Sequence, residues 1–450
     1  MAPRETEAQL LELAAWGAGL RAADIPPPIA ERSKLVLLDL IGCNLAGSRD
    51  DGMAELARAF GQRAGRATLV GTPVHADAGA AALFNATAIV ALELDETNLF
   101  AKGHPGAHVW PAVLAAAEEN GHSGQALFTA FITGYEIGAR IAQAAQLSPA
   151  VHPHGTAVAP AAVAGLAKLW QYTPVELAAA VQQGAALVVP ADWNAARLGA
   201  TVRNLFAGVS VQNAFVAAES IRCGFTHNPA TLDQVFGRIL GTGFEASALT
   251  SNLGTQWAIA GAVYFKHHAC CLSVHSALDA LIDLKRRSGF EAADVRSVAV
   301  ETYRSAAQLN NREPATPLGA KFSIPHALAA AMVLGETGVE AFGAASLQNK
   351  SVRSLASRIT VSEDPSLTAQ LPDSRPARVV VRLSDRELVG ECPGSQGLAA
   401  TAGAGREIEE KFAQLAVPVI GASVAAAVQE MVWRLDAVEN VNELTSLLAL

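Results

Sequence analysis

Residues 92–111, LELDETNLFAKGHPGAHVWP, gather titratable side chains in a chain that is otherwise poor in charge. The segment holds the acidic run ELDE (93–96), a lysine and two histidines, and an alanine-rich run follows it. Imidazole and carboxylate groups transfer protons when burial and neighbouring charges adjust their pKa values. We therefore interpret Asp95 and His104 as candidate catalytic residues and Thr97 as a candidate substrate-binding residue. The alternative is a solvated loop between two helices.

The position of Pro105 predicts that a helix begins directly after His104. The backbone N–H groups and the dipole at a helix N-terminus favour an anionic ligand. His104 and His108 are four residues apart, a spacing that is compatible with metal binding from one helix face. No acidic partner accompanies them on that face, so we expect an anion site and no metal ligand.

Two further histidines occur in VHPHGT (151–156), just before another alanine-rich helix. The arrangement repeats the one around His104, because a histidine again precedes an apolar helix. We interpret His154 as a candidate catalytic residue and His152 as a candidate substrate-binding residue. A helix N-terminal turn capped by Thr156 is the alternative.

Fixed positive charges come from two other segments. The sequence KHHACC (266–271) places Lys266 and His267 where the helical pattern of the chain ends, and Arg203 lies in the apolar stretch 196–210. Arginine binds a carboxylate through two parallel hydrogen bonds, and lysine supplies a point charge. We interpret Lys266 as both catalytic and substrate-binding, and Arg203 and His267 as substrate-binding. Solvated surface charges are the alternative.

Composition narrows the class of protein. The chain has 450 residues, 51% of them hydrophobic, and a net charge of −9, so it lacks the basic surface that nucleic-acid binding requires. The five cysteines have no paired CxxC spacing, and no nucleotide-binding motif is present. No signal peptide or membrane span is evident. We expect a cytoplasmic homo-oligomer that uses no cofactor and binds a small carboxylate, without nucleic-acid or membrane partners.

Helical periodicity dominates the chain, and alternation typical of strands is confined to one region. Helices are predicted over residues 6–20, 29–47, 52–61, 79–92, 109–120, 124–145, 156–169, 174–189, 208–222, 273–287, 325–335 and 338–346. Strands are predicted over 295–304, 357–364 and 377–391, the last with a turn at 384–386. We expect a mainly α fold, with a large all-helical domain of residues 1–265 and 406–450. A smaller α+β lid domain of residues 266–405 is inserted in it and ends in the glycine-rich segment 394–405.

Stretches along nearly the whole chain resemble the MmgE/PrpD family, which includes 2-methylcitrate dehydratase, cis-aconitate decarboxylase and iminodisuccinate epimerase. They are VLLDLIGCNLAG (36–47), FNATAIVALELDET (84–97), GHPGAHVWPAVLAAAE (103–118), ITGYEIGARI (132–141), HPHGT (152–156), KHHACCLSVHSALDAL (266–281) and GAKFSIPHALAAAMVLG (319–335). The resemblance implies a helical domain interrupted by an α+β lid, and a homodimer.

Two motifs depart from the family pattern. Many members have His followed by Asp-aromatic-Asp-Asp-Thr, whereas this chain has Val90 and then ELDET (93–97). The Lys-Arg-x-His motif of the family is RNLF (203–206) here, so Arg203 takes the place of the lysine that the family assigns to a substrate carboxylate. Cationic character is kept, while the shape of the pocket and its set of proton carriers change.

Proton removal beside a carboxylate creates an enolate-like dianion, which fixed cations such as Lys266 and Arg203 would stabilise. His104, His154 and Asp95 are the candidate acids and bases. We expect a cofactor-independent hydro-lyase that acts on a small di- or tricarboxylate, as 2-methylcitrate dehydratase does. The alternatives are an epimerase or racemase of a dicarboxylate such as iminodisuccinate, a decarboxylase of the cis-aconitate type, and an inactive binding or scaffold homologue.

Overall fold

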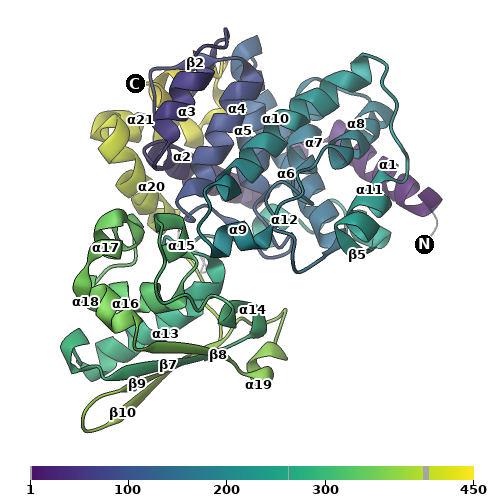
Figure 1. The fold of residues 1–450 in the computed structure, drawn as a ribbon. Helices are drawn as coiled ribbons and strands as arrows, with labels where there is room; N and C mark the ends of the chain where they lie inside the picture. The colour runs from purple at the N-terminus through teal and green to yellow at the C-terminus, as the bar shows by residue number, and fades with distance from the viewer. Residues whose placement is uncertain (1–2, 262, 399–404) are drawn as a thin grey trace.

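The computed structural model describes residues 3–261, 263–398 and 405–450 (Figure 1). The protein is mainly helical, as the sequence predicts. Figure 1 shows a larger helical part and, below it, a smaller part that carries the main sheet. Helices from the N-terminal and C-terminal regions of the chain meet in the helical part, where α20 (Gly405–Ile420) packs against α2 (Pro27–Gly47).

The helical part is built from long helices whose neighbours approach closely. A Cβ atom on Gly138 of α6 would lie 2.3 Å from the Cβ atom of Ala161 on α7, so this contact requires glycine. Besides α2 and α20, the helices are α1 (Pro3–Gly19), α3 (Met53–Phe60), α4 (Ala78–Ala91), α5 (Pro105–Asn120), α6 (Gly124–Ala144), α7 (Pro160–Leu169), α8 (Pro174–Ala186), α9 (Trp193–Arg197), α10 (Val202–Arg222), α11 (Thr231–Gln234), α12 (Ala258–Gly261), α21 (Ala422–Trp433) and α22 (Asn442–Leu448).

Local capping signals explain several helix starts. Thr173 and Glu176 form a reciprocal capping box around Pro174, the first residue of α8. Ser123 accepts a hydrogen bond from the Ala126 N–H at the start of α6. Helix α5 begins at Pro105, so His104 is its N-cap residue, as predicted.

The sheet-bearing part contains a four-stranded sheet in the order β10-β9-β7-β8. Strands β9 (Ala377–Arg382) and β10 (Glu387–Cys392) form the predicted hairpin; β7 (Ser297–Thr302) pairs antiparallel with β9 and parallel with β8 (Ile359–Glu363). Helices α13 (Leu272–Ser288) and α16 (Ile324–Leu334) lie between the sheet and the helical part in Figure 1. The short helices are α14 (Arg304–Ala307), α15 (Pro317–Lys321), α17 (Ala344–Gln348), α18 (Lys350–Ala356) and α19 (Pro365–Thr368).

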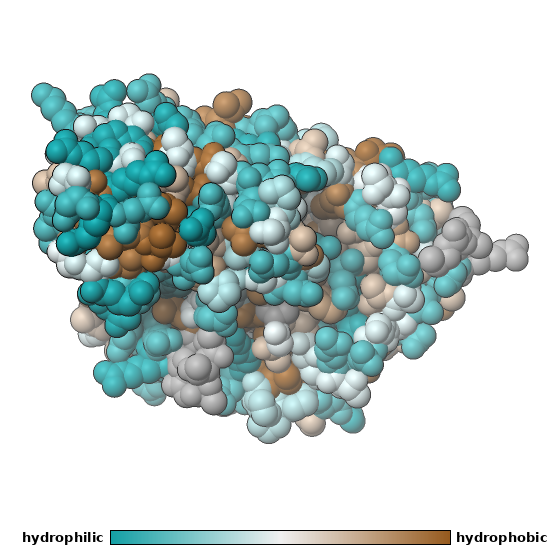
Figure 2. All heavy atoms as spheres, turned by 90° about the horizontal axis from the view of Figure 1, so that it is seen from below, coloured by the Kyte–Doolittle hydropathy of each residue, from teal (hydrophilic) through white to brown (hydrophobic). Residues whose placement is uncertain are grey.

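The buried apolar side chains form one cluster that includes residues of both parts, such as Leu38 of α2, Leu278 of α13 and Val300 of β7. The two parts are therefore packed together. Hydrophilic side chains cover most of the face on the sheet side, and apolar ones form smaller patches (Figure 2). None of the described helices is both long and apolar enough to cross a membrane.

Some predicted elements were wrong. The helix predicted from residue 208 begins at Val202, because the polar residues of VRNLF do not interrupt it. Residues 338–346 form a single 3-10 turn, Val339–Phe342, followed by α17. The helical pattern up to Phe265 is also interrupted, since the glycine-containing β5 (Gly241–Phe244) pairs with β4 (Ala145–Leu147). Residues 399–404 of the predicted glycine-rich segment lie outside the described residues.

A further short pairing brings two distant segments together. Strand β3 (Thr97–Asn98) pairs antiparallel with β6 (Val263–Tyr264), which places Thr97 opposite Tyr264. This pairing carries Lys266, two residues beyond β6, to the end of α4. The other pair, β1 (Ala67–Thr68) with β2 (His75–Ala76), lies away from this region of the chain.

Candidate active site

The segment between α4 and β3 is buried and acidic. Glu93, Asp95 and Glu96 have 2%, 0% and 0% of their surface exposed. Glu93 has a φ of 54°, in the left-handed region that non-glycine residues seldom adopt. The turn at Glu93 directs its side chain and that of Asp95 into the protein, where each must find a positive partner.

Four buried cations converge on the carbonyl groups at the C-terminal end of α4. They come from α10, from the segment after β6, from α15 and from α20, and each donates a hydrogen bond to a different carbonyl. The pairs are Arg203 Nη1 with Val90 O (2.9 Å), Lys321 Nζ with Ala91 O (2.8 Å), Lys266 Nζ with Glu93 O (3.0 Å) and Lys411 Nζ with Leu94 O (2.7 Å). Val90 and Ala91 belong to the last turn of α4, whose carbonyls carry partial negative charge, and Glu93 and Leu94 follow it. This end of α4 and the segment after it therefore hold the cations in place.

Glu93 serves two of these cations at once. Its Oε1 atom forms an ion pair with Arg203, and its Oε2 atom lies 3.3 Å from Lys266 Nζ. Burial alone would raise the pKa of Glu93, but Arg203 and Lys266 together lower it below its usual value. Burial would likewise lower the pKa of Lys266, and Glu93 and Asp95 raise it instead. The three groups are therefore ionised and carry a net charge of about +1.

Asp95 and His104 form a second buried pair. Asp95 Oδ2 lies 2.7 Å from His104 Nδ1. Although burial opposes ionisation, the charge of His104 and its hydrogen bond lower the pKa of Asp95 to about 2. The ionised carboxylate fixes the orientation of the imidazole and leaves Nε2 as the nitrogen that is free to exchange a proton.

Three more imidazoles stack behind His104. The ring of His154 lies 4.5 Å from that of His104 and 4.9 Å from that of His152, centre to centre. Burial lowers the pKa of His154 and of His152 well below the usual value, so both rings are neutral. His108 accepts a hydrogen bond from the Gly155 N–H at Nε2 and lies 2.8 Å from the His104 carbonyl at Nδ1. With both ring nitrogens engaged, His108 is not placed to bind a metal ion together with His104.

Glu96 has a different environment from its neighbours. It accepts hydrogen bonds from the Gly106 N–H and the Tyr135 hydroxyl, and no cation of the described part of the chain forms an ion pair with it. Burial, together with the charge of Asp95, raises the pKa of Glu96 to about 8. Glu96 is therefore protonated at neutral pH and ties the acidic segment to α5 and α6.

A cavity of about 140 Å³ lies in front of these groups. Pockets for drug-sized ligands measure roughly 300–1,000 Å³, so this space suits a small metabolite. Its walls come from both parts of the protein. The helical part contributes Glu93, Thr97, Leu99, Lys102, His104, His152, Pro153, Trp193 and Arg203. The sheet-bearing part contributes Lys266, Cys271, Leu272, Ser273, Phe322 and Arg375. Leu272 and Ser273 begin the 17-residue helix α13, whose N-terminus adds to the positive potential.

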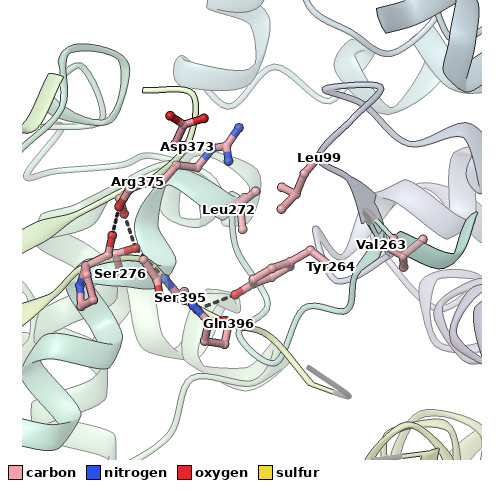
Figure 3. A pocket seen from close by; sticks show the side chains of 13 residues that line it. Leu99, Val263, Tyr264, Leu272, Ser276, Asp373, Arg375, Ser395 and Gln396 are labelled. Atoms are coloured by element: carbon pink, nitrogen blue, oxygen red, sulfur yellow. Dashed lines mark hydrogen bonds between the residues drawn. The ribbon is translucent and has the colours of Figure 1, made fainter. Parts of the chain in front are cut away.

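Thr97 offers the cavity an unused polar group, since its buried Oγ1 atom finds no hydrogen-bond partner among the described residues. A second cavity of about 380 Å³ adjoins the first and shares Leu99, Leu272 and Arg375 with it (Figure 3). Arg375 belongs to the loop before β9 and adds a cation between the two cavities. Arg375 therefore contributes a positive charge to the walls of both cavities.

Of the residues singled out from the sequence, the structure places Thr97, His104, His152, Arg203 and Lys266 in the cavity wall. Asp95 lies behind His104, and His154 is stacked behind the same ring. His267 lies outside this cavity, beside His268, His275 and Asp279. Among the described residues, His267, His268 and His275 form the group whose ligand atoms are close enough together to hold a metal ion.

Sequence reasoning missed several cavity residues. Glu93 stood in the acidic run but was not recognised as the counter-ion of Arg203 and Lys266. Trp193 and Phe322, whose ring centres are 5.9 Å apart, line the cavity from α9 and from the end of α15. The motif KFSIP (321–325) could have drawn attention to Phe322, but no local pattern marks Trp193 or Arg375.

The arrangement can bind a carboxylate between two cations and move a proton at His104.

Comparison with known proteins agrees with this architecture. The MmgE/PrpD N-terminal domain matches residues 11–245, and the MmgE/PrpD C-terminal domain matches residues 268–437. The cis-aconitate decarboxylase-like protein oryM of Aspergillus oryzae is 27% identical, over 97% of this chain and 96% of its own. Cis-aconitate decarboxylase of Aspergillus terreus is 25% identical, over 97% of this chain and 95% of its own. With both domains matched in order across most of its length, the chain belongs to the MmgE/PrpD family.

Proposed function

We propose that this protein is a cofactor-independent lyase that acts on a small di- or tricarboxylate. The observation that carries the proposal is the shared counter-ion: Arg203 and Lys266 are buried at a small cavity and have one carboxylate, Glu93, between them. A substrate carboxylate can complete the neutralisation of this pair. Such preorganised cations stabilise the negative charge that develops when a carbanion forms beside a carboxylate.

His104 is the proposed proton carrier, because it lines the cavity and Asp95 holds its other nitrogen. In a dehydration, neutral Nε2 takes the proton from the carbon next to a carboxylate, and the electron pair of that C–H bond forms the new C=C bond. The C–O bond on the neighbouring carbon breaks with its electrons on oxygen, and the imidazolium returns the same proton to that oxygen, so that water leaves. Thr97 and the N-terminus of α13 are positioned to hold a further carboxylate or hydroxyl group of the substrate.

Decarboxylation is the second candidate, and the relatives named as cis-aconitate decarboxylases favour it. In that reaction, the electrons of the broken C–C bond remain on the substrate as CO2 leaves, and protonated His104 gives its proton to the resulting carbanion. The same residues serve both reactions, since each needs fixed cations and one mobile proton.

A panel of substrates tests the proposal. We would incubate the full chain with 2-methylcitrate, citrate, cis-aconitate and iminodisuccinate in D2O, and follow each by NMR. Appearance of an alkene indicates dehydration, loss of a carboxylate indicates decarboxylation, and deuterium exchange with inversion indicates epimerisation. Asp95→Asn is the matched inactive control. Absence of turnover and exchange with every member would count against the lyase, and thermal stabilisation without turnover would favour an inactive binding homologue.

We also propose that the protein is a cytoplasmic homodimer assembled through its helical part, with the sheet-bearing part as a lid over the cavity. Helix α10 supports the dimer, because exposed or half-exposed apolar residues recur every seven positions on one face of it, at Val202, Val209 and Val216. Val202 and Val216 are 49% and 57% exposed, which leaves apolar surface for a second subunit to cover.

A further inference from the structure

Outside the cavity, three imidazoles and a carboxylate face one another where the chain passes from β6 into α13. The ring centres of His267 and His268 are 4.0 Å apart, and those of His268 and His275 are 4.9 Å apart. Asp279 Oδ1 lies 3.1 Å from His267 Nε2 and 3.0 Å from His268 Nε2. His275 and Asp279 are four residues apart on α13, so they share one helix face.

Hydrogen bonds leave this cluster incompletely satisfied. His267 Nδ1 is buried and finds no hydrogen-bond partner among the described residues. His275 Nε2 lies 3.3 Å from the Cys270 carbonyl, which can only accept, so Nε2 carries the hydrogen and Nδ1 keeps its lone pair. The Tyr264 hydroxyl group donates a hydrogen bond to that lone pair at 2.9 Å, and a metal ion bound at Nδ1 would displace it.

Outer contacts orient the rings as they do around bound metal ions. His268 Nδ1 lies 2.6 Å from Thr337 Oγ1, which holds the ring with Nε2 towards Asp279. The Cys270 carbonyl accepts a hydrogen bond from His275 Nε2 and in the same way fixes that ring, which leaves Nδ1 as the ligand nitrogen. Metal-ligating histidines typically have the second ring nitrogen hydrogen-bonded to a carbonyl, a carboxylate or water, which fixes the tautomer.

We propose that His267, His268, His275 and Asp279 form a binding site for a divalent first-row transition-metal ion, best matched by Zn²⁺. Three imidazoles and one carboxylate supply four donors, the coordination number of protein-bound zinc. The ligand atoms of the three histidines lie within 4.8 Å of one another. Zn–N bonds of about 2.0–2.1 Å would draw them closer, and the partly exposed ring of His267 has room to turn.

The ion would have a structural role. It would tie residues 267–268, which directly follow Lys266, to the first turns of α13, whose N-terminus faces the cavity. An entry path exists, since His267 also lines an open cavity of about 530 Å³ together with Lys266 and Lys411. The proposal departs from the expectation of no metal ligand, which considered His104 and His108, and it does not depend on the proposed function.

Zinc binding to the full chain, prepared without an affinity histidine tag, tests this site. After treatment with a chelator, the protein would be dialysed against ZnCl2, freed of unbound ion and analysed for zinc by elemental analysis; Co²⁺ would report tetrahedral geometry by its visible absorption. We expect one equivalent of zinc per chain. We also expect zinc to raise the melting temperature, because an ion that binds the folded state stabilises it.

Variants locate the ion. Asp279→Asn and His268→Gln should lose stoichiometric zinc and the thermal shift. Thr337→Val, which removes only the outer hydrogen bond, should weaken zinc binding by about 10–100-fold. His75→Gln, at an exposed position of β2, and His104→Gln, in the cavity, should bind zinc as the unaltered chain does.

The proposal is overturned if the unaltered chain fails to retain one equivalent, a result that needs no variant. It is also overturned if Asp279→Asn binds zinc unchanged, or if binding is lost in His104→Gln or His75→Gln instead. Circular dichroism without zinc identifies any variant that fails to fold. Because the Asp279 side chain is 27% exposed, its isosteric replacement is the variant that should fold best.

Discussion

Replacement of Lys266 by methionine removes a buried ammonium group and keeps an unbranched side chain of similar length. In the free protein, Glu93 retains Arg203 as a partner. The loss of folding stability should therefore be smaller than the ~3–5 kcal/mol that is typical when a buried charge is left without any partner. A substrate carboxylate at the 3.3 Å distance that separates Glu93 Oε2 from Lys266 Nζ would interact with the ammonium by about 5 kcal/mol at an effective dielectric constant of about 20. Part of this energy is specific to the transition state, and loss of one such preorganised group costs about 2.7–4 kcal/mol.

We therefore expect kcat/KM of Lys266→Met to fall by about 10²–10³-fold on whichever substrate the panel identifies. Steady-state kinetics and the melting temperature would be measured together. Lys321→Met is the matched control, because Lys321 is a buried lysine that caps the neighbouring Ala91 carbonyl but does not line the cavity. It should cost stability without a comparable loss of kcat/KM.

Two results would refute this reasoning. If Lys266→Met keeps nearly full kcat/KM, the ammonium does not contact the transition state. If Lys266→Met and Lys321→Met lose the same activity, the effect comes from the end of α4 and not from the substrate. Arg203→Lys keeps the charge and loses the planar guanidinium group, so its smaller loss should appear mainly in KM.

Three other predictions concern proton transfer, pH and assembly. Asp95→Asn should lower kcat by about 10²–10⁴-fold with little change in KM, because the imidazole of His104 loses the anion that orients it; equal kcat values would contradict this role. Glu96 has a folded-state pKa of about 8 against 4.5 for the ordinary group, so its contribution to stability is present below about pH 4.5 and is lost as the pH rises towards 8. As the pH rises from 4.5 to 8, the free energy of unfolding of Glu96→Gln, measured in urea, should therefore increase relative to that of the unaltered chain by up to about 5 kcal/mol. If the free energies of unfolding of the two proteins change identically with pH, the carboxyl group is ionised when folded. Val216→Glu should convert the proposed dimer to a monomer in light scattering, and a monomer without the substitution would disprove the dimer.

Local signals in the sequence predicted the parts of the fold that depend on a few neighbouring residues. The start of α8 at Pro174, the start of α5 at Pro105 and the hairpin between β9 and β10 all follow from residue types within one turn. The mainly α class followed from the same periodicity. Where a polar residue lies inside a helix, as Arg203 does in α10, the pattern misplaced the boundary, since burial against distant charges overrides amphipathic alternation.

The site was less accessible to sequence reasoning. Thr97 and Lys266 are brought together by the pairing of β3 with β6, between segments more than 160 residues apart in the chain. The left-handed turn at Glu93 has no marker in the sequence, because glutamate is not a residue that favours that conformation. Long-range pairing and a strained turn together decide which carboxylate meets which cation.

The binding of cations to the carbonyls at the end of α4 has a consequence for how the sequence of this protein can evolve. Arg203, Lys266, Lys321 and Lys411 are anchored on main-chain carbonyls, which every amino acid possesses. Mutations that alter the side chains at positions 90, 91 and 94 leave these acceptors in place. The positions of these cations are thus insulated from drift in the acidic segment, whereas the proposed proton carrier His104 and its partner Asp95 can be exchanged one at a time. If Arg203 and Lys266 bind the substrate carboxylate as proposed, new reactions can then evolve without passing through a variant that no longer binds its substrate.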